Sequence, residues 1–129
     1  MYPHSHLPAP LQPAEFYLLL ALNRTEAHGY AIRAMIANLS LGSVRIPDSN
    51  IYRLIHKLAD EAYIEPTGDK PTAKTGTPRT HYTITTHGTL RLKEELIRLD
   101  HALKVAQNAS LMQDDTPIDI QRLILDAQT

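Results

Sequence analysis

The fold is decided by the stretch Ile46-Pro47-Asp48-Ser49-Asn50-Ile51-Tyr52-Arg53-Leu54-Ile55-His56-Lys57-Leu58-Ala59-Asp60-Glu61-Ala62-Tyr63-Ile64. Its apolar residues recur at i, i+3, i+4, i+7 and i+11, which is one face of an amphipathic helix: Ile51, Leu54, Ile55, Leu58 and Ala62. Pro47, Asp48 and Ser49 stand just before this pattern, and a short oxygen-bearing side chain there can accept a hydrogen bond from an amide of the first turn. We therefore expect a helix that begins near residue 48.

The opposite face of this helix is polar and basic at its N-terminal end. It carries Asn50, Arg53, His56 and Lys57, whereas the acids Asp60 and Glu61 lie only at the far end. Arginine pairs with guanine and asparagine with adenine in the major groove, so this face suits the reading of base edges. A core helix with a solvated charged face is the alternative, and the neighbouring segments decide between the two.

The bulk properties describe one domain, or one domain with an extension. The chain has 129 residues, of which 43% are hydrophobic and 21% charged, as in globular proteins. A net charge of −1 gives no overall basic signature for nucleic acid, so the distribution of charge has to carry that argument. No cysteine, no signal-like start and no apolar run of about 20 residues are present, so we expect a cytoplasmic protein with no membrane partner.

The N-terminal part divides into an arm and an apolar helix. Residues 1–12 are rich in proline and predict a flexible arm. A helix is expected over 13–23, with Pro13 at its first position and Glu15 in its first turn. Residues 16–22 are apolar nearly all round the helix, so it must be covered on most sides, and a partner subunit is the natural source of the missing cover.

A second helix completes a helix-turn-helix candidate. After a short polar turn over 24–27, the triplet His28-Gly29-Tyr30 opens a helix whose apolar set is Ile32, Met35, Ile36 and Leu39. The connector over 41–46 has room for one short extended piece at 44–46. Two helices and a connector that lead into a third, basic-faced helix are typical of this motif.

A hairpin, or wing, is expected next. Residues 63–66 predict a short strand and 67–78 a polar loop, and residues 79–85 alternate with Tyr82 and Ile84 on one face. Lys70, Lys74 and Arg79 stand against Asp69, which leaves a local excess of two positive charges (3 − 1). An ordinary solvated loop is the alternative interpretation.

The longest predicted helix covers 86–109 and is capped by Thr85 or Thr86. It carries a heptad seam spaced 4, 3, 4 and 3, made of Leu92, Leu96, Leu99, Leu103 and Ala106. Leu90 and Ile97 are expected to widen this stripe toward the rest of the domain. The seam predicts pairing with a partner subunit, with burial inside one subunit as the alternative. A short last helix is expected over 118–125; from residue 110 the charge is −3 (1 − 4), so this tail does not face phosphate.

The order of elements is that of a winged helix-turn-helix, which is mainly α with a small β-hairpin. At the residue level the chain resembles the PadR family of bacterial transcriptional regulators over about residues 13–108. The matching residues open the second helix, form the recognition-helix pattern, and span the second wing strand and the start of the long helix: His28, Gly29, Tyr30, Ile51, Tyr52, Leu54, Leu58, Arg79, Tyr82, Ile84, Thr85 and Gly88.

The chain departs from the family pattern at four positions. Ser49 and Asn50 stand where the family usually has Gly and then Ser or Thr, Ala62 replaces a Gly after the recognition helix, and His81 replaces a common Tyr. The changes at the start of the helix leave the operator sequence undetermined, but they do not put the fold in doubt.

The resemblance implies a homodimer built on the first and last helices, and repression relieved by a ligand such as a phenolic acid or a lipophilic drug. The expected regions are the arm over 1–12, the winged domain over 13–85 and the dimerisation region over 86–129. We expect an apolar effector pocket at the dimer centre, with Tyr17 and Leu20 in its lining. Because the chain lacks Trp, it lacks the aromatic platform that some family members use to bind flat drugs, so the identity of the effector is left undetermined.

The leading hypothesis is a dimeric regulator that binds double-stranded operator DNA. Ser49, Asn50, Arg53 and Lys57 would meet the major groove, and Tyr52 would either touch a phosphate or pack at the domain edge. The wing residues would hold the flanking backbone and set the register: Lys74, Arg79 and His81.

Two other classes of function compete with DNA binding. A winged-helix protein-interaction module without DNA binding fits the near-neutral charge. An enzyme is disfavoured, because the sequence offers no Cys, no nucleophile turn and no cluster of metal ligands. We therefore expect no catalytic residue, no cofactor and no metal site.

Overall fold

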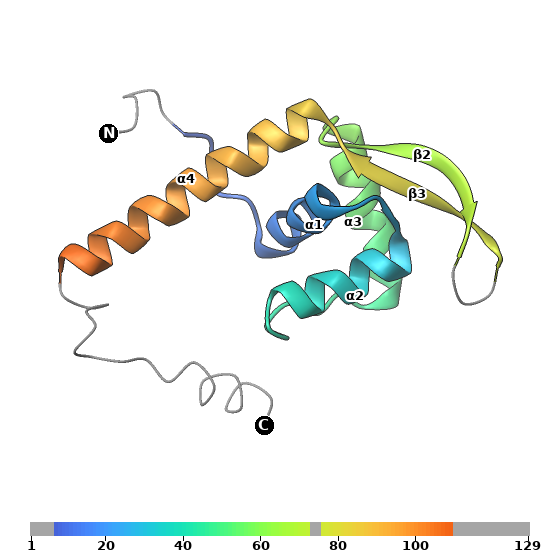
Figure 1. The fold of residues 1–129 in the computed structure, drawn as a ribbon, viewed down its shortest axis with the longest axis horizontal. Helices are drawn as coiled ribbons and strands as arrows, with labels where there is room; N and C mark the ends of the chain where they lie inside the picture. Colours follow the sequence, from blue (N-terminus) through green and yellow to red (C-terminus); the bar gives the residue numbers. More distant parts are fainter. Residues whose placement is uncertain (1–6, 73–75, 110–129) are drawn as a thin grey trace.

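Four helices and a three-stranded antiparallel sheet make up the computed structural model, which describes residues 7–72 and 76–109 (Figure 1). The mainly helical architecture with a small sheet confirms the predicted fold class. Lys74 and the expected last helix over 118–125 lie outside the described residues. The elements follow in the order α1 (Pro13–Arg24), β1 (Ala27–His28), α2 (Gly29–Leu39), α3 (Asp48–Asp60), β2 (Ile64–Pro71), β3 (Pro78–Ile84) and α4 (Thr86–Asn108).

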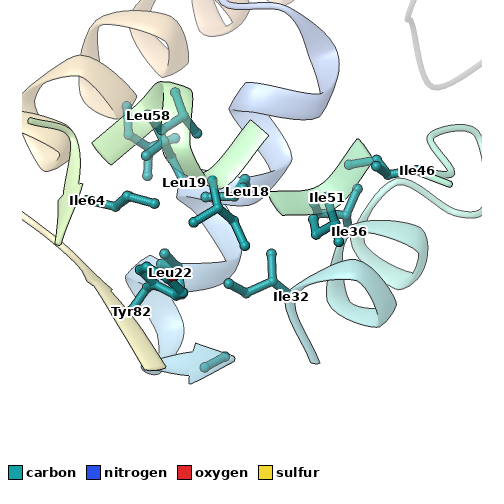
Figure 2. Packing of buried hydrophobic residues seen from close by; sticks show 13 residues of the cluster. Leu18, Leu19, Leu22, Ile32, Ile36, Ile46, Ile51, Leu58, Ile64 and Tyr82 are labelled. Atoms are coloured by element: carbon teal, nitrogen blue, oxygen red, sulfur yellow. The ribbon is translucent and has the colours of Figure 1, made fainter. Parts of the chain in front are cut away.

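Helix α1 lies at the centre of the hydrophobic core, as its apolar surface requires. Leu18, Leu19 and Ala21 are fully buried, and Leu22 is nearly so. Figure 2 shows the α1 leucines surrounded by side chains from α2, α3 and the sheet. The residues that cover α1 come from every other major element: Ile32, Ile36, Ile51, Ile55, Leu58, Ile64, Tyr82 and Leu92. The chain itself therefore supplies much of the cover that α1 needs.

The segment before α1 is held between α4 and α1. The Leu11 amide donates to Glu95 Oε1 at 3.0 Å, and the Gln12 amide donates to Glu15 Oε1 at 2.9 Å. Arg91 Nη2 donates to the carbonyl of Ala9 at 2.6 Å, and Arg98 donates to that of Pro8. These bonds fix residues 8–12, which the sequence predicts as part of a flexible arm.

The sheet has the order β1-β3-β2 and differs from the prediction in three ways. Residues 27–28, expected as the end of a turn and the start of α2, form strand β1, which pairs with Tyr82 and His81. Strand β2 reaches residue 71 instead of 66, through a register shift between Pro66 and Gly68, and an edge strand tolerates such prolines. No strand forms over 44–46, because the Ser40 hydroxyl accepts from the Val44 amide at 2.9 Å and replaces a strand partner.

Helix α4 begins where the sequence predicts. The Thr85 hydroxyl accepts a hydrogen bond from the Gly88 amide at 2.9 Å, so Thr85 is the N-cap. A Cβ at position 88 would overlap the carbonyl oxygen of Tyr63, so only glycine lets α4 start this close to β2. Across the described residues, no helix combines the length and apolar character that a membrane span needs.

His28 joins the sheet to α2. It is the N-cap of α2, with Nδ1 accepting from the Ala31 amide at 3.5 Å, and its ring meets that of His81 edge-on at 5.2 Å between centroids. Burial, and then the neighbouring charges of His81 and Arg79, hold the pKa of His28 below its ordinary value. The folded protein therefore favours a neutral His28.

We expect Ala62→Gly to stabilise the protein by up to about 1 kcal/mol. Ala62 has a φ of 65°, in the left-handed region that disfavours a Cβ, at the position where the family resemblance leads one to expect glycine. Chemical denaturation measures the change. His56→Gly, at an exposed position inside α3, is the control and should lower stability. A loss of stability in Ala62→Gly would contradict the inference that the backbone at Ala62 is strained.

His28 should also make the fold sensitive to acid. Because its folded pKa lies below the unfolded value of about 6.5, its contribution is complete above that pH and is lost as pH falls toward the folded pKa. His28→Asn keeps a capping side chain but cannot titrate, so its free energy of unfolding should fall less between about pH 7 and pH 5. His56→Asn, on an exposed part of α3, is the control. An unchanged pH dependence in His28→Asn would argue against this role.

Candidate DNA-binding surface

Helix α3 presents its polar face outward because its apolar face is locked into the core. Ile51, Ile55 and Leu58 have no exposed surface, so the helix cannot rotate about its axis without exposing them. Ser49, Asn50, Arg53 and His56 are exposed on the other side, as the sequence predicts.

The exposed residues of α3 differ in their partners. Ser49 Oγ donates to Asn50 Oδ1 at 3.4 Å, a long contact that leaves both side chains adaptable. Arg53 is exposed and forms no ion pair with any residue in the described ranges, 7–72 and 76–109. It can therefore offer two parallel hydrogen bonds to a single acceptor group.

A hollow of about 370 Å³ runs beside the N-terminal half of α3. Asn50, Arg53 and Lys57 border it from α3, and Arg45 borders it from the preceding connector. Three of the four predicted major-groove residues therefore gather on one surface, and an additional cation joins them. The remaining lining is apolar: Ala14, Val44, Ile46, Pro47 and Leu54.

The start of α3 is fixed by an arginine that sequence reasoning missed. Arg33 on α2 donates to the carbonyl of Ile46 and pairs with Asp48 Oδ1 at 2.8 Å. Asp48 therefore occupies the first turn of α3 and bonds to α2, whereas its predicted role was in capping. The partners are 13 and 15 residues apart in sequence, so no local pattern indicates this contact.

Tyr52 packs at the domain edge, which is one of its two predicted alternatives. A Cβ added to Gly29 would lie 2.8 Å from the Tyr52 ring, so the tyrosine rests directly on the backbone at the start of α2. This contact explains why the middle residue of the His-Gly-Tyr triplet is glycine, since any side chain there would displace the ring. Tyr52 is half-buried as a result.

Lys57 lies on the predicted face but its charge is already paired. Its ammonium bonds to the buried carboxylate of Glu15 and lies 3.8 Å from Glu61 Oε1. The bond to Glu15 raises the pKa of Lys57 above its ordinary value. Lys57 therefore differs from Arg53, one turn earlier, in having a partner inside the protein.

The base of the wing carries a stack of aromatic and basic side chains. The Arg79 guanidinium lies 4.8 Å from the centroid of the Tyr30 ring, a cation–π distance that holds it beside α2. His81 Nδ1 lies 2.8 Å from the Arg79 carbonyl oxygen. Lys70 pairs with Glu26, so its charge does not add to the local positive excess that the sequence predicts. Of the three predicted wing contacts, Arg79 and His81 lie together and Lys74 is outside the described residues.

The predicted seam on α4 divides into two parts. Leu92 is 2% exposed and packs into the core of its own subunit, whereas Leu96, Leu99 and Leu103 are 41–45% exposed. Ala106 is half-buried. Figure 1 shows the C-terminal half of α4 extending away from α1, α2 and α3, and no other helix or strand within residues 7–72 and 76–109 covers it.

Leu90 corrects one expectation about α4. It is 57% exposed, so it does not widen the stripe toward the rest of the domain. The first turns of α4 are anchored instead through Gly88 and Leu92, which are both buried. These two contacts set the face of α4 that turns inward, and Leu90 falls outside it.

The residues expected to line an effector pocket lie on α1. Tyr17 and Leu20 are both half-buried, and the Tyr17 ring meets that of Phe16 edge-on at 5.0 Å. The effector pocket stays a prediction. Within residues 7–72 and 76–109, no group of three or more His, Asp or Glu side chains is arranged to hold a metal ion.

Comparisons with known proteins agree on one family. The model of the transcriptional regulator PadR-like family matches residues 18–94. A PadR-like transcriptional regulator from Bacillus cereus is 22% identical, with a TM-score of 0.62 over 77% of this chain and 92% of that one. Bacillus subtilis PadR, solved in complex with operator DNA, is 26% identical, with a TM-score of 0.57 over 67% of this chain and 48% of that one. No curated protein gives a significant match. Because the family model spans more than half of the residues, the chain belongs to the PadR-like family of transcriptional regulators.

Proposed function

We propose that this protein is a dimeric, sequence-specific repressor that binds operator DNA through α3 and the wing. The observation that carries the proposal is Arg53: its guanidinium is exposed and has no ion-pair partner among the described residues, and it lies on a helix that is held from the other side by the fully buried Ile51, Ile55 and Leu58. A fixed helix lets a planar donor pair meet one guanine reproducibly. The Bacillus subtilis relative, which was solved with operator DNA, supports the same activity here.

The wing and α3 would contact different parts of the DNA. Arg53, Ser49 and Asn50 would meet base edges, since they lie on the exposed first turns of α3. Arg79, His81 and Lys74 would hold the flanking phosphates, which set register without carrying sequence information. The stacking of Arg79 on Tyr30 favours a fixed approach to the backbone.

The homodimer would form along the exposed part of the α4 seam. Leu96, Leu99 and Leu103 are large apolar side chains left exposed at heptad spacing, and pairing two copies of α4 would remove them from water. Tyr17 and Leu20, half-buried on α1, would line an apolar effector pocket near the centre of this dimer, and ligand binding there would relieve repression. Ligand binding that survives charged substitutions at both positions would argue against this pocket.

A protein-interaction module without DNA binding is the second candidate. The observations that favour it are the net charge of −1 and the internal pairing of Lys57 and Lys70, which reduce the positive surface available to phosphate. A wild-type protein that binds no duplex even at low salt would favour this candidate over the regulator.

Leu99→Glu should convert the dimer to monomers or aggregates, because it places a charge in the apolar seam. Light scattering at micromolar concentration reports the mass. Leu90→Glu is the matched control, since Leu90 is also exposed but lies nine residues, about 2.5 helical turns, from Leu99 and thus on the opposite side of α4. A wild-type monomer in the same measurement would rule out the α4 seam as a dimer interface.

Arg53→Ala should weaken the binding free energy for the operator by roughly 1–3 kcal/mol and that for scrambled DNA by much less, because it removes a bidentate base contact. Arg79→Ala should weaken both duplexes alike and reduce the salt slope by about one. Titrations of both variants and wild type at two salt concentrations separate these effects, with an operator selected from random-sequence DNA. Tyr30→Leu controls for the loss of stacking alone.

The two substitutions can contradict the assignment separately. Equal losses on both duplexes for Arg53→Ala would make it a phosphate contact and move base reading to Ser49 and Asn50. A loss confined to the operator for Arg79→Ala would place a wing residue at a base edge.

A further inference from the structure

Two buried carboxylates hold the segment that leads into α1, and they differ in one respect. Glu95 on α4 accepts from the Leu11 amide and pairs with Arg98 of its own helix. Glu15 on α1 accepts from the Gln12 amide and pairs with Lys57, which belongs to α3. Both carboxylates are almost inaccessible, at 5% and 6% exposure. Only the Glu15 pair joins the start of α1 to the DNA-facing helix.

Lys57 is placed where it could serve as a DNA contact. It follows Arg53 by one turn and borders the same hollow as Asn50 and Arg53. Its side chain keeps 54% of its surface exposed. What distinguishes it from Arg53 is the buried carboxylate beside it, with Glu61 as a second, more distant acid.

The energetics favour the internal pair. A buried carboxylate that loses its only cationic partner is left uncompensated in a poorly solvated site, which is far costlier than losing an exposed ion pair. A phosphate could give Lys57 only a solvated, salt-screened contact in exchange. Lys57 should therefore stay with Glu15 when DNA is present.

We propose that Glu15 sets the DNA affinity of the protein by withholding Lys57 from the DNA. Glu15 is a positioning residue, which acts on DNA only through Lys57. This inference rests on the proposed function and corrects its sequence-based form, in which Lys57 meets the major groove. It also means that α1, which carries none of the proposed base-reading residues, controls how much positive charge α3 offers.

The test compares salt slopes of operator binding among four variants. Glu15→Gln keeps a hydrogen-bonding side chain but removes the charge, so Lys57 becomes free; the slope should steepen by about one and affinity at low salt should rise. Lys57→Ala should leave the wild-type slope unchanged, and the double variant should return to it. Glu95→Gln, which removes the other buried carboxylate without touching α3, is the matched control and should leave the slope unaltered.

A second measurement does not depend on a stable variant of Lys57. In an NMR titration the pKa of Lys57 should fall in Glu15→Gln, because the bond that raises it is lost. In wild type the Lys57 side-chain resonance should not move when operator DNA is added. This observation carries the test even if the substituted proteins fail to fold.

The outcomes separate the inference from the function on which it rests. A wild-type protein that binds no duplex rejects both. Wild-type binding with a slope that drops by about one in Lys57→Ala, or a Lys57 resonance that shifts with DNA, rejects the withholding role alone and restores Lys57 as a contact.

Discussion

The need to bury α1 organises the rest of the molecule. This helix is apolar on nearly every side, so residues of α2, α3, β3 and α4 join its leucines in one core cluster, and Leu18 and Leu19 have no exposed surface. This arrangement fixes α3 by its inner face and leaves the outer face to carry function. It also places α4 along one side, with its C-terminal half beyond the core (Figure 1). The proposed DNA-reading surface and the proposed dimerisation surface are thus both consequences of covering a single helix.

Some basic side chains of this protein form ion pairs within the chain, and others are left available to a partner. Lys57, Lys70, Arg33 and Arg98 are each paired within the chain, whereas Arg53 is free of ion pairs among the described residues. A nearly neutral protein can still offer a cation to DNA if it leaves that cation unpaired at a fixed place.

Local patterns predicted most of the fold, and long-range contacts account for the differences. The periodicity placed Ile51, Ile55 and Leu58 correctly on the buried face of α3, whereas Ala62, the last member of the predicted apolar face, lies exposed beyond the end of the helix. Thr85 was one of the two predicted caps of α4. Strand β1 was missed because two residues are too few to alternate, and their pairing with β3 spans more than 50 positions. The same holds for the site: exposure of Asn50 and Arg53 follows from helix geometry, but the Glu15–Lys57 pair joins residues 42 apart and leaves no local signal.

In the proposed dimer, two copies of α3 read one operator symmetrically. Hydroxyl-radical footprinting of a selected operator, combined with the stoichiometry of the complex, tests it most directly. The account predicts two chains per duplex and two protected half-sites whose centres lie about 10–10.5 base pairs apart, or a multiple of that spacing, because a two-fold dimer meets the same face of the duplex once per turn. One chain per duplex, or a single undivided protected segment, would contradict it.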